Sequence, residues 1–225
     1  MGGESVPEPG SKLELAATVV LAIATVVTAW SAFQSAKWSG VQSINFSKAS
    51  AERTESVRAS DRANTQTAVD VDTFVAWASA VSQDRGGARP STQPYTPVPG
   101  TLSGFLFERF RPEFRSAVQA WLRTRPLVTP GAPSSPFVMP EYRLAEAMKA
   151  DRLARQADES RRAAVQSNQR SDNYVLTTVL FAAVLFFAGI STKLVGRRSR
   201  LLVFGCAVVL LLAGAVVLAT FPVEI

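Results

Sequence analysis

The sequence contains no histidine and a single cysteine, Cys206. The absence of histidine excludes the common zinc and haem sites and the nucleophiles that histidine activates, and one cysteine cannot form an intrachain disulfide. Glycine-rich phosphate loops and the G-x-S-x-G motif are also missing. We therefore expect a protein that is not an enzyme and that holds no metal and no cofactor.

Over most of the chain, neither basic nor acidic residues are clustered. The 24 basic residues are interleaved with 18 acidic ones, although the net charge is +6. A nucleic-acid-binding face needs clustered cations, so we expect no nucleic-acid partner.

Apolar residues are instead concentrated in three long runs, residues 13–33, 174–190 and 201–219. Each run is about long enough to cross a hydrocarbon core of roughly 30 Å as a helix. We predict an all-α integral membrane protein with transmembrane helices at residues 11–35, 174–195 and 201–222. A cleaved signal peptide is the alternative for the first run, but its acidic flank and its uninterrupted helical pattern favour a span.

Orientation follows from the short loop at residues 196–200, between the second and third spans. This region carries basic residues and no acid, which is typical of a cytoplasmic loop. The N-terminus is then cytoplasmic, and residues 34–173 and the C-terminus are extracytoplasmic. Lys37 and Arg170 oppose this orientation, but long translocated segments are only weakly governed by charge. The topology-determining residues are Lys193, Arg197, Arg198 and Arg200.

Two long helices are predicted between the first two spans. Residues 36–83 contain no proline and one glycine, which predicts an outgoing stalk helix continuous with the first span. Pro140 suits a first helical turn, and residues 140–173 form a return stalk helix that continues into the second span. An antiparallel stalk of coiled-coil type is the simplest arrangement of two helices that leave and re-enter the membrane side by side. Residues 1–10 are expected to be a flexible tail.

The Pro/Gly-rich residues 84–139 are predicted to form a distal cap with short helices and a break at Pro112. Two interpretations of its apolar side chains are open. In the first, they pack on Phe74, Trp77 and Val81 of the outgoing helix. In the second, they form a surface for an envelope protein or a neighbouring subunit. The residues of this possible partner surface are Phe105, Phe110, Phe114 and Trp121.

Two polar sets near the membrane are the remaining candidate sites. Hydroxyl residues on the first span form either a pore lining or a helix-packing face: Thr18, Thr25, Thr28 and Ser35. Amide and carboxylate residues at the outer surface form either an ion- or water-coordinating vestibule or a band that fixes helix register. This juxtamembrane polar band consists of Gln34, Gln42, Asn45, Gln166, Asn168, Gln169, Asp172 and Asn173.

Three segments carry a resemblance: RFRPEFRSAVQAWL, SPFVMPEYRLAEA and NQRSDNYVLTTVLFAAVLFFAGIST. In these the chain resembles a group of uncharacterised bacterial inner-membrane proteins with three spans and a long loop between the first two. The similarity is broadest over residues 109–192, and WSAFQSAKWSG after the first span is similar to the same group. The resemblance implies a multi-pass protein of the bacterial plasma membrane and carries over no activity.

We expect a non-enzymatic, homo-oligomeric scaffold or accessory subunit that presents a helical domain outside the cytoplasm. Its expected partners are the lipid bilayer, further copies of itself and an envelope protein that contacts the cap. The alternative is a homo-oligomeric channel or transporter-like pore lined by the hydroxyl residues of the first span.

Overall fold

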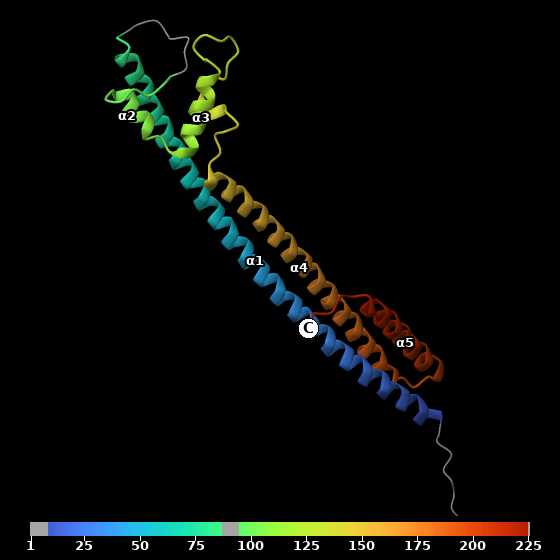
Figure 1. The fold of residues 1–225 in the computed structure, drawn as a ribbon. Coiled ribbons are helices and arrows are strands. Elements are labelled where there is room, and N and C mark those ends of the chain that lie inside the picture. The colour runs from blue at the N-terminus through green and yellow to red at the C-terminus, as the bar shows by residue number, and fades with distance from the viewer. Residues whose placement is uncertain (1–8, 87–94, 225) are drawn as a thin grey trace, which may run out of the picture. The chain divides into compact units, whose positions relative to one another are not determined.

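The computed structural model describes residues 9–86 and 95–224, and every regular element in these ranges is a helix (Figure 1). The expected tail at residues 1–10 lies almost entirely outside the described residues. The elements in chain order are α1 (Pro9–Asp84), α2 (Leu102–Glu108), α3 (Pro112–Arg123), the 3-10 helix η1 (Pro136–Val138), α4 (Ala145–Ser191) and α5 (Arg197–Ala219).

Three of these helices, α1, α4 and α5, are long and apolar enough to cross a membrane. Helix α1 continues without interruption from the first apolar run into the polar sequence that follows, as predicted from the absence of proline. Helices α2 and α3 are separated at Pro112, which occupies the first position of α3, where a missing amide hydrogen is tolerated.

Helix α4 begins at Ala145 and not at Pro140, where we predicted its start. The backbone forms a turn before it, with Tyr142 N–H donating to the Met139 carbonyl at 3.0 Å. The Arg143 side chain donates to the Pro140 carbonyl at 3.0 Å, which satisfies an acceptor of the turn. Side-chain contacts of Tyr142, described below, hold this turn away from helical geometry.

Helix α5 begins at Arg197, so the predicted basic loop at residues 196–200 is wrong in its bounds. Arg197, Arg198 and Arg200 belong to the first turn of the helix. Arg200 also has an acidic partner, because its guanidinium lies 3.1 Å from a carboxylate oxygen of Glu14 on α1. The local sequence without acids does not reveal this pairing across 186 residues.

The chain divides into two compact units. We call the described residues up to Ala49 together with those from Asp158 onward the span unit, and the described residues of Ser50–Ala157 the central unit. In the span unit, parts of α1 and α4 run beside α5 (Figure 1). Their shared core consists of Ala24, Phe181, Val184, Ala188 and Ala207.

Close helix packing in the span unit depends on Gly214 of α5. A Cβ atom there would lie 2.4 Å from Cδ2 of Leu180 and 2.8 Å from Cε1 of Phe181. Only glycine permits this approach of α5 to α4. The outward positions of the same unit carry large apolar side chains, such as Val26 and Leu202, which are 70% and 72% exposed. Apolar side chains directed outward are expected of helices whose solvent is lipid.

The central unit has a separate aromatic core (Trp77, Phe107, Phe110, Phe114 and Val118), against which Phe74 and Val81 also pack. Phe114 is fully buried, stacks on Phe137 with ring centroids 5.1 Å apart and meets Phe74 edge to face at 6.2 Å. The apolar stripe of α3 therefore faces α1 and η1, as the first of the two interpretations of the cap describes.

Candidate functional site

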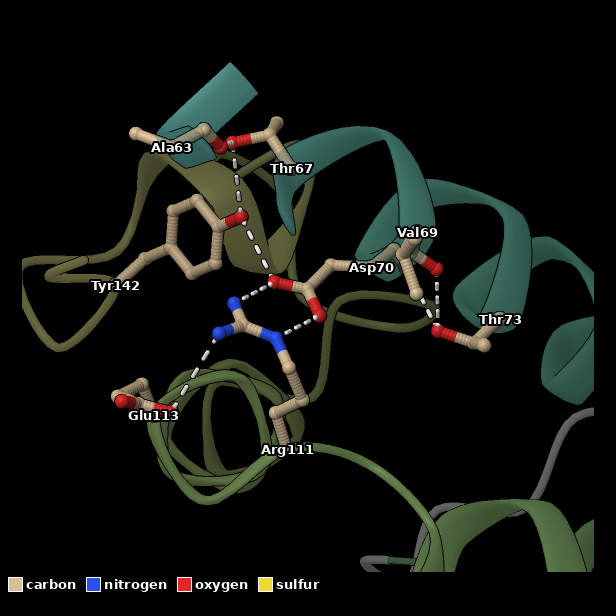
Figure 2. Close-up of polar contacts among 8 residues, drawn as sticks. All are labelled: Ala63, Thr67, Val69, Asp70, Thr73, Arg111, Glu113 and Tyr142. Atoms are coloured by element: carbon tan, nitrogen blue, oxygen red, sulfur yellow. Dashed lines mark hydrogen bonds and ion pairs between the residues drawn. The ribbon is translucent and has the colours of Figure 1, made fainter. Parts of the chain in front are cut away.

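A buried carboxylate, Asp70 of α1, is the centre of a polar cluster in the central unit (Figure 2). The Arg111 guanidinium donates two hydrogen bonds to this carboxylate, from Nε to Oδ1 at 3.0 Å and from Nη2 to Oδ2 at 2.6 Å. The hydroxyl of Tyr142 lies 3.0 Å from Oδ2 and 3.3 Å from Oγ1 of Thr67. Glu113 lies 3.7 Å from Nη1 of Arg111 on the outer side.

Electrostatics in this cluster favour the charged form of Arg111 and the neutral form of Tyr142. The hydrogen bonds to Asp70 raise the pKa of Arg111, and burial is the main cause that raises the pKa of Tyr142 above 10.0. Both Asp70 oxygens are occupied by donors from within the chain, so the carboxylate holds segments together instead of presenting a free base. The cluster joins α1, the start of α3 and the turn before α4, and we call it the Asp70 clamp.

A second set of contacts in the central unit joins α1 to α4. Glu55 accepts from Nζ of Lys149 at 3.2 Å, and Arg62 Nε donates to Glu146 at 3.0 Å. The Ser56 hydroxyl donates to the Ala150 carbonyl at 2.8 Å. Hydrogen bonds from Lys149 and then Arg62 lower the pKa of Glu55 below its usual 4.5.

The segment after α5 is held in the span unit by a third set of side chains. Gln34 of α1 is fully buried, and its amide pairs with both backbone groups of Glu224, donating to the carbonyl at 3.1 Å and accepting from the N–H at 2.9 Å. Trp38 Nε1 and the Tyr174 hydroxyl both donate to the Pro222 carbonyl, at 3.1 and 3.0 Å. We call this site the C-terminal seat.

The juxtamembrane polar band is divided among separate hydrogen-bond groups in the described residues. Gln34 belongs to the C-terminal seat. On α4, Asn168 bonds Asp172 at 2.9 Å and Gln169 bonds Asn173 at 3.4 Å, each pair within its own helix. Gln42 and Asn45 are half-buried, and Gln166 is exposed. Within the described residues, the hydrogen bonds of the band therefore form separate groups, and both the vestibule and the register interpretation stay predictions.

The predicted hydroxyl face is also divided. Thr18, Thr25 and Thr28 each donate to the carbonyl four residues earlier, at 2.9, 2.8 and 2.7 Å. Thr18 and Thr25 are exposed, whereas Thr28 is half-buried. Ser35 lies 3.0 Å from the Ser171 hydroxyl of α4. These residues therefore do not share one environment within a single chain.

Two of the four residues predicted as a partner surface are wrong. Phe110 and Phe114 are 3% and 0% exposed and lie in the central core. Trp121 is half-buried, with its Nε1 donating to the Pro133 carbonyl at 2.8 Å. Phe105 alone is prominent on the surface, with the Arg109 guanidinium 3.6 Å above its ring.

Sequence reasoning missed the Asp70 clamp and the C-terminal seat. A signal for the first was present, since Asp70 lies seven residues from both Ala63 and Trp77 and therefore on the same buried helix face. A charge at such a position requires a partner. The signal for Gln34 was its place between Ser31 and Trp38 on the equivalent face. Neither pattern identifies the partner residue.

Among the described residues, no group of three or more carboxylates, histidines or cysteines is placed to hold a metal ion. No protein-family model, no curated protein and no solved structure matches the chain. The fold itself defines the class: three helices long and apolar enough to cross a membrane in an all-helical chain are those of a multi-pass membrane protein.

Proposed function

We propose that this is a non-enzymatic protein of the bacterial inner membrane, which oligomerises through its spans and presents the central unit outside the cytoplasm as a scaffold or accessory subunit. One observation carries the oligomeric part of the proposal. An exposed stripe of small residues follows α1 at alternating spacings of four and three. Its members are Thr18, Ala22, Thr25, Ala29, Ala32 and Ala36.

Small residues at this spacing support helix association in lipid. They allow two backbones to approach closely, so packing contacts and hydroxyl contacts replace those with lipid chains. The buried face of α1, which carries Ala17 and Ala24, already packs within the chain. The exposed stripe is thus free for α1 of a second copy, and it includes Thr18 and Thr25 of the predicted helix-packing face.

The contacts between α1 and α4 support an antiparallel stalk as part of this proposal. In the central unit, Glu55 pairs with Lys149 and Arg62 with Glu146. The residue numbers of α1 therefore increase in the direction in which those of α4 decrease, as in an antiparallel pair. Such a stalk, with the Asp70 clamp securing the cap elements on α1, gives a rigid support for the exposed surface around Phe105.

The test is the mass of the full chain purified in mild detergent, measured by light scattering with the detergent contribution subtracted. We expect a defined multiple of 24.2 kDa. Ala29→Leu places a bulky side chain in the stripe and should shift the species toward monomer. Ala182→Leu, the same substitution at an exposed position of α4, is the matched control and should leave the mass unchanged. A wild-type chain that is strictly monomeric with no co-purifying protein would refute the proposal.

The alternative function, a pore lined by Thr18, Thr25, Thr28 and Ser35, receives less support. Only the first two lie on the exposed stripe, and Ser35 contacts Ser171 of its own chain. Three of the four hydroxyls donate to carbonyls of α1 itself.

A further inference from the structure

An apolar groove of about 540 Å³ lies between α4 and α5 in the span unit. It is lined almost entirely by apolar atoms, from Phe187 of α4 and from Leu202, Gly205, Cys206, Val209 and Leu210 of α5. The α5 residues recur at spacings of three and four, so they form one continuous row along the helix. Gly205 leaves the row open, because a Cβ atom there would have no neighbour within 4 Å.

Positive charge is concentrated at one end of this groove. Arg198 precedes Leu202 by four residues and therefore continues the same row toward the start of α5. Arg197 and Lys193 are close by in sequence, and all three side chains are exposed. Within residues 9–86 and 95–224, no acidic side chain is ion-paired with any of them, in contrast to Arg200.

The start of α5 adds partial positive charge at the same end. Its N-cap residue, Gly196, offers no side-chain hydrogen bond to the first turn. Unsatisfied backbone N–H groups at a helix N-terminus favour an anion. Side chains on a helix lean toward its N-terminus, so Arg198 extends away from the apolar row and toward the membrane surface.

We propose that this groove is a binding site for an anionic phospholipid. One acyl chain lies along Leu202, Gly205 and Val209, and the headgroup phosphate binds Arg198 and the first-turn amides of α5. The charge complementarity selects an anionic lipid over a zwitterionic one, since basic pockets between transmembrane helices bind anionic headgroups. This inference rests on insertion of the spans into a membrane and is independent of the proposed scaffold function.

The experiment compares two photoactivatable lipids that carry the same diazirine on an acyl chain, one with a phosphatidylglycerol and one with a phosphatidylcholine headgroup. Each is added at a low fraction to phosphatidylcholine vesicles that contain the full chain, and cross-linked residues are mapped by peptide mass spectrometry. We expect cross-links at residues 202–209, with the phosphatidylglycerol yield roughly five-fold higher, about the factor contributed by one arginine at an anionic surface.

Two pairs of variants separate the headgroup contact from the groove. Arg198→Gln should abolish the preference for phosphatidylglycerol, and Arg197→Gln, which removes the same charge from another helix face, should retain most of it. Gly205→Leu should fill the groove and reduce cross-linking of both lipids. Gly189→Leu is its control, because a Cβ atom at Gly189 also has open space and this residue is not part of the groove.

Three outcomes would overturn the proposal. Equal yields from the two lipids would mean that the groove holds ordinary boundary lipid without headgroup recognition. An equal loss of preference in Arg197→Gln and Arg198→Gln would mean diffuse attraction. Efficient oxidation of Cys206 to an intermolecular disulfide, with no lipid cross-links nearby, would mean that a second copy occupies the groove. The last result would leave the scaffold proposal intact.

Discussion

At the scale of single residues, Asp70 is a buried carboxylate that pairs with the charged Arg111 and the polar Tyr142. Its two oxygens accept hydrogen bonds from the fork of Arg111, and Oδ2 also lies within hydrogen-bond distance of Tyr142. A carboxylate that is removed from water requires such partners, because an unpaired buried charge is strongly destabilising. The clamp therefore fixes the start of α3 on α1 by an ion pair, in addition to the packing of the aromatic core.

Arg111→Met should destabilise the central unit by about 3 kcal/mol, because it leaves Asp70 buried without its cation. The measurement is denaturant unfolding of the full chain in detergent, followed by the fluorescence of Trp77 and Trp121. Tyr142→Phe should cost only about 1 kcal/mol, the usual contribution of one hydrogen bond. In the double variant Asp70→Leu/Arg111→Met no buried charge is left unpaired, so it should be more stable than Arg111→Met alone. A double variant that is less stable would contradict this account.

Glu55 gives the central unit a pH dependence of defined sign. Hydrogen bonds from Lys149 and Arg62 lower its pKa in the folded chain below 4.5, so its ion pairs stabilise the fold fully above that pH. This contribution is lost as the pH falls through the folded-state pKa. The difference in melting temperature between wild type and Glu55→Gln should therefore be largest near pH 6 and shrink below pH 4.5. Glu141→Gln, an exposed position outside the network, is the control; a pH-independent difference for Glu55→Gln would disprove the assignment.

At the scale of elements, the C-terminal seat explains how the segment after α5 is held in the span unit. Residues after a helix need partners for their backbone groups, particularly near a bilayer where water is scarce. Gln34, Trp38 and Tyr174 supply four hydrogen bonds to Pro222 and Glu224. These contacts connect the end of the third apolar helix to α1 and α4, so α5 is held at this end by polar contacts as well as by Gly214 packing.

Gln34→Leu should release this segment while leaving the helices folded. Leucine has a similar size, but it leaves the Glu224 N–H and carbonyl without the amide partner. This should lower the local stability of the segment by about 1–3 kcal/mol. Hydrogen–deuterium exchange of the C-terminal peptide should accelerate by at least roughly five-fold as a result. Gln119→Leu removes the same amide at an exposed position of α3, outside the seat, and should leave the exchange unchanged. Equal acceleration in both variants would show that the amide pairing is not what holds the segment.

At the scale of the whole molecule, the proposed orientation depends on the cations between the second and third apolar helices. Arg200 is neutralised by Glu14, which leaves Lys193, Arg197 and Arg198 to set the charge of that side. These three cations have no ion pair in the described part of the chain, and in a short connection they still favour a cytoplasmic position. The proposed orientation would place the central unit on the opposite side of the membrane.

Cysteine labelling tests this orientation directly. In a Cys206→Ser background, Ser134→Cys introduces a thiol at an exposed position of the central unit. A membrane-impermeant maleimide should label it from outside intact spheroplasts. Ser199→Cys, exposed in the first turn of α5, should react only after permeabilisation. The reverse pattern would place the central unit in the cytoplasm and would overturn the orientation.

The sequence by itself determined the three apolar helices, the continuity of α1 and the break at Pro112, because each depends on local composition or on backbone restrictions of neighbouring residues. Helix ends were predicted less well: the turn before Ala145 is held by contacts of Tyr142 with α1, and Arg197 begins a helix that our prediction placed in a loop. Only the tertiary structure decided which polar groups meet, from the Asp70–Arg111 pair to the Gln34–Glu224 pairing 190 residues apart. The physical reason is that a helical pattern specifies which face is buried, whereas the partner of a buried polar group depends on how distant helices pack.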